Sequence, residues 1–190
     1  MNNAPSVIEP VYDSTQDTTD HINLVATNMD QMIGNLQARK GAHDQSKLHS
    51  PEKEMFDKYT PILKSLKYGS DEYMATVKEM TETALAHHYE HNTHHPEHFG
   101  YLECDNCYKH HSLNHVGPCD KCDHKALTLR GDVSGMTLLD IFEMLADWKA
   151  AGQRTNAGNI ADSLVKNRDR FKLNDQLFAI LENTVKELGW

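Results

Sequence analysis

The sequence has no surplus of basic charge and no long apolar run, and these two absences exclude several classes of protein. Lys and Arg number 19 against 28 Asp and Glu, a formal net charge of −9 with His neutral. Sequence-independent binding to nucleic acid or to an anionic membrane needs a cationic surface instead. No apolar stretch approaches the roughly 18 residues that span a bilayer, and the start MNNAPSVIEPVYDSTQ lacks the segments of a signal peptide. We therefore expect a soluble, cytoplasmic protein with neither a membrane nor a nucleic acid as partner.

Aromatic residues are also scarce, at 7%, and hydrophobic residues make up 38% of the 190 residues. This composition is polar, but it is not poor enough in apolar residues for a disordered chain. Two residue types stand out against it. Ten of the thirteen histidines lie between His87 and His124, and all four cysteines lie between Cys104 and Cys122. Because His and Cys are the best protein ligands for transition metals, the composition indicates metal chemistry.

Apolar residues recur with helical spacing along most of the chain, which predicts an all-α protein of five or six helices. The predicted helices cover about residues 18–37, 51–66, 70–92 and 137–151, and two further stretches at 160–171 and 177–188. Pro61 interrupts or bends the second of them. The predicted domain organisation is a flexible N-terminal arm (1–16), a helical domain in two parts (17–99 and 135–190) and a small insertion (100–134).

The insertion contains two CxxC turns, Cys104-Asp-Asn-Cys107 and Cys119-Asp-Lys-Cys122, separated by eleven residues. Two such turns supply four thiolates for a tetrahedral structural Zn2+ site of the ribbon or knuckle type. Metal binding also supplies folding free energy that so short a module cannot obtain from burial. A pair of disulfides is the alternative, which a reducing compartment disfavours. The module has no basic stripe, so we expect it to act as a lid or an interaction surface rather than to bind nucleic acid.

A second group of candidate ligands is spread along the helical part of the chain. It consists of His21 on the first helix, the pair His43-Asp44 in HDQSK, the run HHYEHNTHHPEHF, and Asp140 in MTLLDIFEMLADWKAA. Each has a plainer interpretation. His21 could be a core histidine, the histidine run could be a solvated cluster, and the ridge of Asp140, Glu143 and Asp147 could be a solvated helix face. Together, however, imidazoles and carboxylates indicate a site for one or two divalent ions.

The order His, His-Asp, histidine cluster, Asp resembles the HD-domain superfamily of metal-dependent phosphohydrolases. HDQSK is similar to the HDIGK of HD-GYP phosphodiesterases, and DIFEMLADWK to their DVFDALTSDR. The runs HHYEHNTHHPEHF, MTLLDIFEMLADWKAA and NRDRF resemble more closely an HD-like family of tailed phages and bacteria, over about residues 18–188. This family resemblance implies an HD-like helical bundle with the four-cysteine module inserted, acting in the host cytoplasm if a phage encodes it.

The resemblance also implies roles for single residues. His21, His43, Asp44 and Asp140 match the ligands of the superfamily's first metal, and His88 with His94 or His95 match those of a second. Lys47 corresponds to a residue that contacts the substrate phosphate, and Arg154, Asn167 and Arg170 are weaker candidates for the anion pocket. The ions would be Mn2+, Fe2+, Mg2+, Co2+ or Zn2+.

The expected reaction is hydrolysis of a nucleotide phosphoester, in a deoxynucleoside monophosphate or a cyclic nucleotide. Lys47 would stabilise the transition state, with Asp44 on the metal and Asp140 or an unligated histidine relaying the proton. Two alternatives stay open: a di-iron oxygenase on the HD fold, and a non-catalytic interaction protein that uses the zinc module. The apolar C-terminal helix ending in Leu188 and Trp190 could pack against a second copy.

Overall fold

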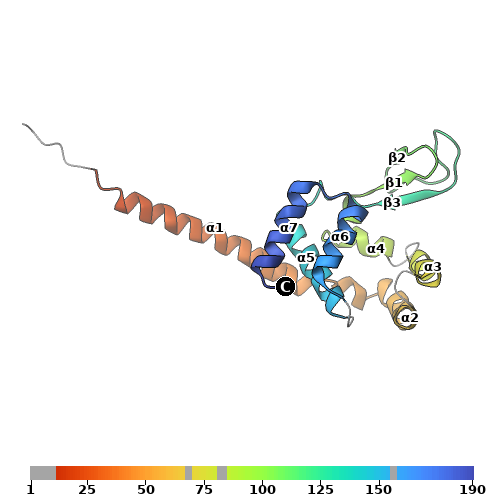
Figure 1. Cartoon of the computed structure of the whole chain (residues 1–190), viewed down its shortest axis with the longest axis horizontal. Helices are drawn as coiled ribbons and strands as arrows, with labels where there is room; N and C mark the ends of the chain where they lie inside the picture. Colours follow the sequence, from red (N-terminus) through yellow and green to blue (C-terminus); the bar gives the residue numbers. More distant parts are fainter. Residues whose placement is uncertain (1–11, 67–69, 81–84, 155–157) are drawn as a thin grey trace, which may run out of the picture. The chain divides into compact units, whose positions relative to one another are not determined.

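The computed structural model describes residues 12–66, 70–80, 85–154 and 158–190, and these are mostly helical with one small antiparallel sheet (Figure 1). Within the described helices, none is long and apolar enough to cross a membrane. The helical elements are α1 (Thr15–Ala42), the 3-10 turn η1 (Gln45–Leu48), α2 (Glu52–Ser65), α3 (Asp71–Met80), α4 (Ala86–His91), the 3-10 turn η3 (Pro96–Phe99), α5 (Leu138–Gln153), α6 (Ile160–Phe171) and α7 (Asp175–Glu187). The helical class predicted from the sequence is therefore confirmed.

The chain divides into two units, residues 1–38 and residues 39–190. The first unit contains most of α1, and no residue of this helix is buried. The predicted arm falls partly outside the described residues, which begin at Tyr12, and α1 begins at Thr15, before the end of that predicted arm. The second unit contains all the remaining elements.

The core of the second unit lies between α5, α6 and α7. Its buried members are Leu145, Ile160, Leu164, Phe171, Leu173, Leu181 and Val185. Trp148 stacks on Phe171, with ring centroids 6.0 Å apart and planes at 3°. Of the apolar residues predicted for the last two helices, Leu188 is half exposed instead, at 50%. Burial of these side chains is worth roughly 1.5–3 kcal/mol each. This packing holds α5 in a fixed position, and α5 carries part of the candidate site described below.

Capping side chains set where these helices begin. Thr137 and Asp140 form a reciprocal capping box at the start of α5, and the side chains of Asn159 and Asn174 accept backbone N–H groups at the starts of α6 and α7. Each interaction satisfies an N–H group that the helix itself leaves unpaired. The residues at which α5, α6 and α7 begin are therefore determined by side chains that are close to them in the sequence.

The predicted insertion contains the sheet, whose strand order is β2-β1-β3. β1 (Tyr101–Cys104) pairs antiparallel with β2 (His110–His111) and with β3 (Leu127–Arg130). Glu103 Oε1 accepts a hydrogen bond from Arg130 Nε at 2.8 Å across β1 and β3. The pairing places Cys104, fully buried, at the end of β1.

Pro61 lies inside α2 without interrupting it, because the helix continues to Ser65. The stretch 70–92, expected to be helical, contains α3 and α4, and residues 81–84 between them lie outside the described residues. The short α4 leads into the turn that carries His94 and His95, and this turn matters for the site.

Candidate metal centres

Three short segments of the second unit bring the histidine cluster together. His43 and Asp44 follow the last turn of α1, where Asp44 adopts a left-handed conformation (φ 57°) and begins η1. Aspartate tolerates this conformation better than most residues. His88 lies on α4, and His94 and His95 lie on the turn that Pro96 ends.

Four side-chain atoms from these segments converge: the carboxylate of Asp44 and the imidazoles of His88, His94 and His95 each offer one ligand atom within 4.8 Å of the others. His88 Nε2 lies 2.9 Å from His95 Nε2 and 3.3 Å from Asp44 Oδ1, and His94 Nε2 lies 3.6 Å from Asp44 Oδ1. Ligands about 2.1 Å from one ion, at angles of about 90–110°, lie about 3.0–3.4 Å apart. The spacing and the donor set therefore fit a transition metal ion.

Two atoms of this group are buried without any hydrogen-bond partner among the described residues. They are Asp44 Oδ1 and His94 Nε2. A buried carboxylate oxygen or imidazole nitrogen without a partner lowers the stability of the folded state by roughly 1–3 kcal/mol, and such atoms are rare in proteins. A cation held between these two atoms would satisfy both of them.

Glu52 determines which nitrogen of His88 is available. This carboxylate is completely buried at the start of α2 and contacts His88 Nδ1 at 2.9 Å and His87 Nδ1 at 2.7 Å. A carboxylate bound to Nδ1–H holds the imidazole in the tautomer whose Nε2 lone pair is free, as in carboxylate–histidine–metal triads. Asn92 donates to the His88 carbonyl at 2.8 Å and fixes the same turn.

Glu143 on α5 does the same for two further histidines. Its Oε1 lies 2.9 Å from His43 Nδ1 and 3.2 Å from His94 Nδ1, while its Oε2 accepts from Arg39 at 2.9 Å. The Nε2 atoms of His43 and His94 remain available to other partners. His43 Nε2 lies 3.6 Å from Asp44 Oδ2 and 3.8 Å from Asp147 Oδ1, so His43, Asp44 and Asp147 form a second, more exposed group.

The charges of the cluster suit metal binding at neutral pH. Burial raises the pKa of Asp44, but the neighbouring His88 imidazole and the charge of Lys47 outweigh it and hold that pKa well below its usual range. Burial, with the neighbouring His94 and His88, lowers the pKa of His95 to about 2, and burial also lowers the pKa of His94. Asp44 is thus ionised, and His94 and His95 are neutral, which are the forms that coordinate metals.

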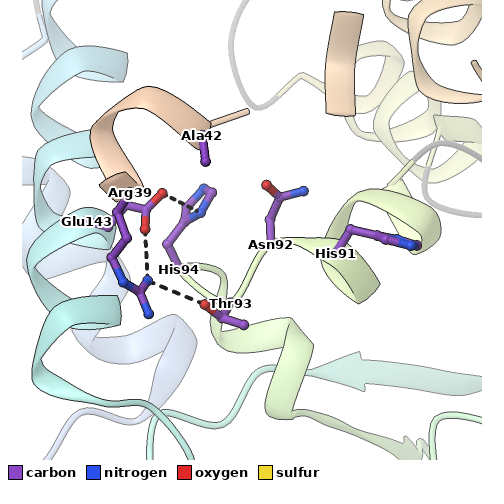
Figure 2. Close-up of a pocket in the computed structure, with 7 residues that line it drawn as sticks. All are labelled: Arg39, Ala42, His91, Asn92, Thr93, His94 and Glu143. Atoms are coloured by element: carbon purple, nitrogen blue, oxygen red, sulfur yellow. Dashed lines mark hydrogen bonds and ion pairs between the residues drawn. The ribbon is translucent and has the colours of Figure 1, made fainter. Parts of the chain in front are cut away.

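A cavity of about 270 Å³ adjoins the cluster. Figure 2 shows Arg39, Glu143, His94 and Thr93 linked by polar contacts at one side of it, with Asn92 and His91 at the other. The lining residues are Arg39, Ala42, His91, Asn92, Thr93, His94 and Glu143. This volume admits a small molecule and no polymer duplex.

The structure does not bring every predicted ligand to this cluster. Asp140 accepts hydrogen bonds from Thr137 and Thr93 and pairs with Arg39 at 2.8 Å. Its carboxylate therefore anchors the start of α5, and Glu143 and Asp147 of the same helix face the histidines instead. His21 lies in the first unit, exposed on α1, and its role as a ligand stays a prediction.

The predicted phosphate contacts also differ in placement. Lys47 lies beside the cluster, because its Nζ donates to Asp44 Oδ2 at 2.6 Å. Arg170 donates to the buried Glu97 at 2.6 Å, and Arg154 is exposed at the C-terminal cap of α5. Lys47 is thus the predicted cation that the structure brings to the candidate metal ligands.

Sequence reasoning missed Glu52 and gave Glu143 and Asp147 no ligand role. Spacing alone shows that Glu143 shares a helix ridge with Asp140 and Asp147, but only the packing of α5 shows which of the three faces the histidines. Glu52 carried no signal of its own, since an acidic residue in a first helical turn is ordinary.

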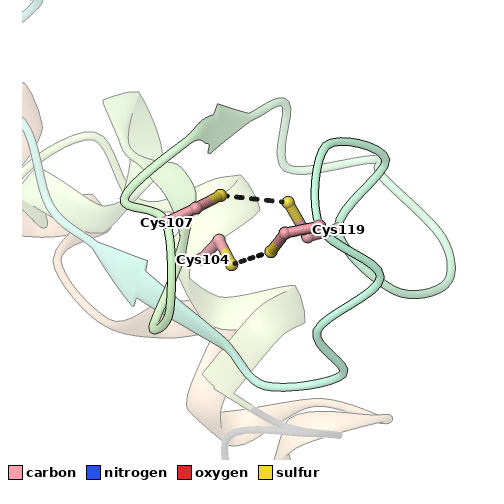
Figure 3. A group of neighbouring side chains, drawn as sticks. Cys104, Cys107 and Cys119 are labelled. Atoms are coloured by element: carbon pink, nitrogen blue, oxygen red, sulfur yellow. Dashed lines mark hydrogen bonds between the residues drawn. The ribbon is translucent and has the colours of Figure 1, made fainter.

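The four cysteines form the second centre, within the sheet module (Figure 3). Cys104 Sγ lies 3.6 Å from Cys122 Sγ, and Cys107 Sγ lies 3.5 Å from Cys119 Sγ. Four sulfurs about 2.3 Å from one Zn2+ would lie about 3.8 Å apart. Hydrogen bonds from the His124 backbone and the Asn106 side chain lower the pKa of Cys122 to about 6, which favours its thiolate. The four thiols can therefore bind a metal.

Comparison with known proteins matches residues 11–187 of the chain to a model described as a family of unknown function, DUF5662. No curated protein and no solved structure matches the chain. The two groups of candidate metal ligands described above are therefore the features of this chain that bear on its chemistry.

Proposed function

The chain belongs to the DUF5662 family, whose function is unknown, and we propose from its histidine cluster that it is a metal-dependent phosphohydrolase acting on a nucleotide. The observation that carries the proposal is the convergence of Asp44, His88, His94 and His95, with two buried ligand atoms that lack any partner among the described residues. The largely helical fold and the order of these residues along the chain support an HD-like bundle.

The ligand set favours a divalent transition metal. Three imidazoles and one carboxylate suit Fe2+, Mn2+, Co2+ or Zn2+ better than Mg2+, which prefers oxygen ligands. Asp44 could hold ions on both of its oxygens, with His43 and Asp147 completing the second position. Such ions supply Lewis acidity toward a phosphoryl oxygen and toward the attacking water.

The protein's own side chains provide the remaining requirements of phosphoester hydrolysis. Glu52 and Glu143 hold the ligand imidazoles in one tautomer and one orientation. Lys47, whose side chain is 29% exposed beside Asp44, would contact the phosphate and stabilise charge that develops in the transition state. Asp140 is assigned a positioning role, because it holds Arg39 and the start of α5.

A small phosphorylated molecule is the substrate class that fits these features. The cavity of about 270 Å³ beside His94 admits a mononucleotide or part of a dinucleotide, and the net charge of −9 opposes binding to polymeric nucleic acid. A deoxynucleoside monophosphate and a cyclic nucleotide are both within the proposal.

The four-cysteine module is proposed to hold one structural Zn2+. Its four thiols leave no position for a substrate, so the ion would stabilise the sheet rather than catalyse. Free thiols persist in reducing compartments, which supports a cytoplasmic location. The module could also bind another protein.

The first test measures metal content per chain by inductively coupled plasma mass spectrometry after loading with Mn2+ or Fe2+. Wild type should carry one zinc and at least one further ion, and Asp44→Ala should lose the further ion while keeping the zinc. Asp57→Ala, which removes an exposed carboxylate of α2, is the matched control and should keep both. If Asp44→Ala retained every ion, the histidine site would be disproved.

The second test incubates the loaded protein with a panel of nucleoside monophosphates and cyclic mono- and dinucleotides. The expected result is hydrolysis of at least one member, detected as phosphate or as the opened nucleotide, and its loss in Asp44→Ala. An intact metal site that hydrolyses no member of the panel would contradict the phosphohydrolase and leave a metal-dependent binding protein or an oxygenase.

A further inference from the structure

The long helix α1 exposes an apolar stripe with the period of a coiled coil. Its members are Ile22, Val25, Met29, Met32 and Leu36, which alternate steps of three and four residues. The first four side chains are 42–60% exposed. This is the a and d pattern of a heptad repeat, and sequences that keep a 3.5-residue period form left-handed coiled coils.

Helix α1 has little stability of its own. No residue among its 28 is buried, and it contains four threonines and two glycines, which disfavour an isolated helix in water. A helix of this composition needs a partner that covers its apolar side. The question is which partner the helix surface selects.

The charges of α1 select a second copy of the same chain. With Ile22 at position a, the acidic residues Asp17, Asp20 and Asp30 fall at positions c, f and b, away from the stripe. Between Thr19 and Asn35 the flanking e and g positions carry no Asp, Glu, Lys or Arg, since they are Thr19, His21, Ala26, Asn28, Ile33 and Asn35; Lys40 occupies the e position that follows Leu36. Two chains of net charge −9 repel each other, and this arrangement keeps like charges apart where the helices would meet.

We propose that α1 pairs with α1 of a second copy, through the stripe from Ile22 to Leu36, to form a two-stranded coiled coil that makes the protein a homodimer. A foreign helical protein would be selected by charges at e and g, and α1 has only Lys40 there, past the end of the stripe.

Sedimentation equilibrium of the full-length, metal-loaded protein tests this proposal between about 5 and about 200 µM. Wild type should approach twice the 21.6 kDa mass of the chain. Met29→Lys, which places two like charges in the seam, should raise the dimer dissociation constant about 100-fold. Leu24→Lys makes the same change in charge on an exposed side chain that lies off the stripe. This variant should change the dimer dissociation constant less than about twofold.

A monomeric wild type throughout this range would overturn the proposal, as would equal effects of Met29→Lys and Leu24→Lys. Hydrogen exchange adds an independent measurement, because α1 amides should become more protected as protein concentration rises. Protection that does not depend on concentration in a monomer would mean that the chain itself covers the stripe, and this too would overturn the dimer. Unchanged zinc content in the variants confirms that they are folded.

Discussion

Glu52, Asp44 and Asp140 are all acidic residues of the second unit, yet each has a different task that its surroundings decide. Glu52 is enclosed by two imidazoles, one buried oxygen of Asp44 has no hydrogen-bond partner among the residues that the structure describes, and Asp140 accepts from hydroxyl, amide and guanidinium donors.

Replacing Glu52 with Gln should weaken metal binding while leaving all the direct ligands in place. Loss of the charge at His88 Nδ1 makes the imidazole a poorer donor at Nε2, and such changes typically cost about 10–100-fold in metal affinity. The measurement is competition with a chelator of known affinity. Glu54→Gln, an exposed neighbour on α2, should behave as wild type. Equal affinities in both variants would remove Glu52 from the site.

Replacing Lys47 with Met should lower kcat/KM for the nucleotide about 100–1000-fold, because an ammonium group aimed at a developing negative charge stabilises the transition state. Metal content should not fall, since Lys47 is no ligand. Lys53→Met, on the exposed side of α2, is the control. A drop in activity shared by both variants would point to net charge rather than to contact with the phosphate.

Replacing Asp140 with Asn should destabilise the second unit by about 1–3 kcal/mol, through the weakened capping box and the lost ion pair with Arg39. Burial raises the pKa of Asp140, but hydrogen bonds from Thr137 and Thr93 outweigh it and lower the pKa below 3.8 in the folded state. The carboxylate therefore contributes stability above the unfolded pKa of about 3.9 and loses it as pH falls through the folded value.

Urea unfolding at several pH values measures this effect. The difference between wild type and Asp140→Asn should be constant near neutral pH and shrink below about pH 4. Asp162→Asn, at the matching but exposed position of α6, should cost only a few tenths of a kcal/mol. If Asp140→Asn lowered the free energy of unfolding by the same amount at acidic and at neutral pH, the ionised carboxylate would contribute nothing to stability.

The elements around the two centres are short and contain few apolar residues. η1, α4 and η3 have four to six residues each, and the strands of the sheet have two to four. Pieces this short cannot stay folded through their own hydrogen bonds. We therefore expect the rest of the second unit to hold the short helical elements in place and a metal bound by the four cysteines to stabilise the sheet.

Removal of the cysteine-bound metal should unfold the sheet and leave the helices. Cys107→Ser is expected to lose one zinc per chain, and amides of β1 and β3 should then exchange with solvent orders of magnitude faster, because metal binding supplies the folding free energy of such modules. Hydrogen exchange read by mass spectrometry checks this, with α5 to α7 as the internal reference. If β1 and β3 stayed protected without zinc, the metal would not be structural.

On the scale of the whole molecule, the histidine cluster joins segments that are distant in the chain. His43 contacts Glu143 of α5, 100 residues later, and Asp44 contacts His88 and His94. A ligand that binds only the folded arrangement stabilises it by mass action.

Saturation of this cluster with metal should therefore raise the melting temperature of the second unit. At about 100 times the dissociation constant the gain is about 2.7 kcal/mol, or about 5–10 °C for a chain of this size. Calorimetry with and without Mn2+ measures the shift. In Asp44→Ala the shift should vanish, and a shift of the same size in this variant would place the binding elsewhere.

The sequence by itself determined the helical class, the starts of the last three helices and the four-cysteine module. These features are local: helical period, capping side chains and CxxC spacing act over a few residues. The resemblance to the HD-domain superfamily also predicted that His43, Asp44 and histidines of the run would share a site.

Only the tertiary structure decided which of the candidate residues meet. Helical spacing could not distinguish Asp140 from Glu143 and Asp147, because the rotation of α5 against the histidine turn depends on the packing of Trp148, Phe171 and the rest of the core. The task of Glu52 likewise arises where α2 packs on α4. The stripe of α1 has the spacing of a core-facing helix, but its first four side chains are exposed in the structure, and this exposure supports the proposed coiled coil. Contacts between distant segments are set by the packing of the whole unit, which no local pattern specifies.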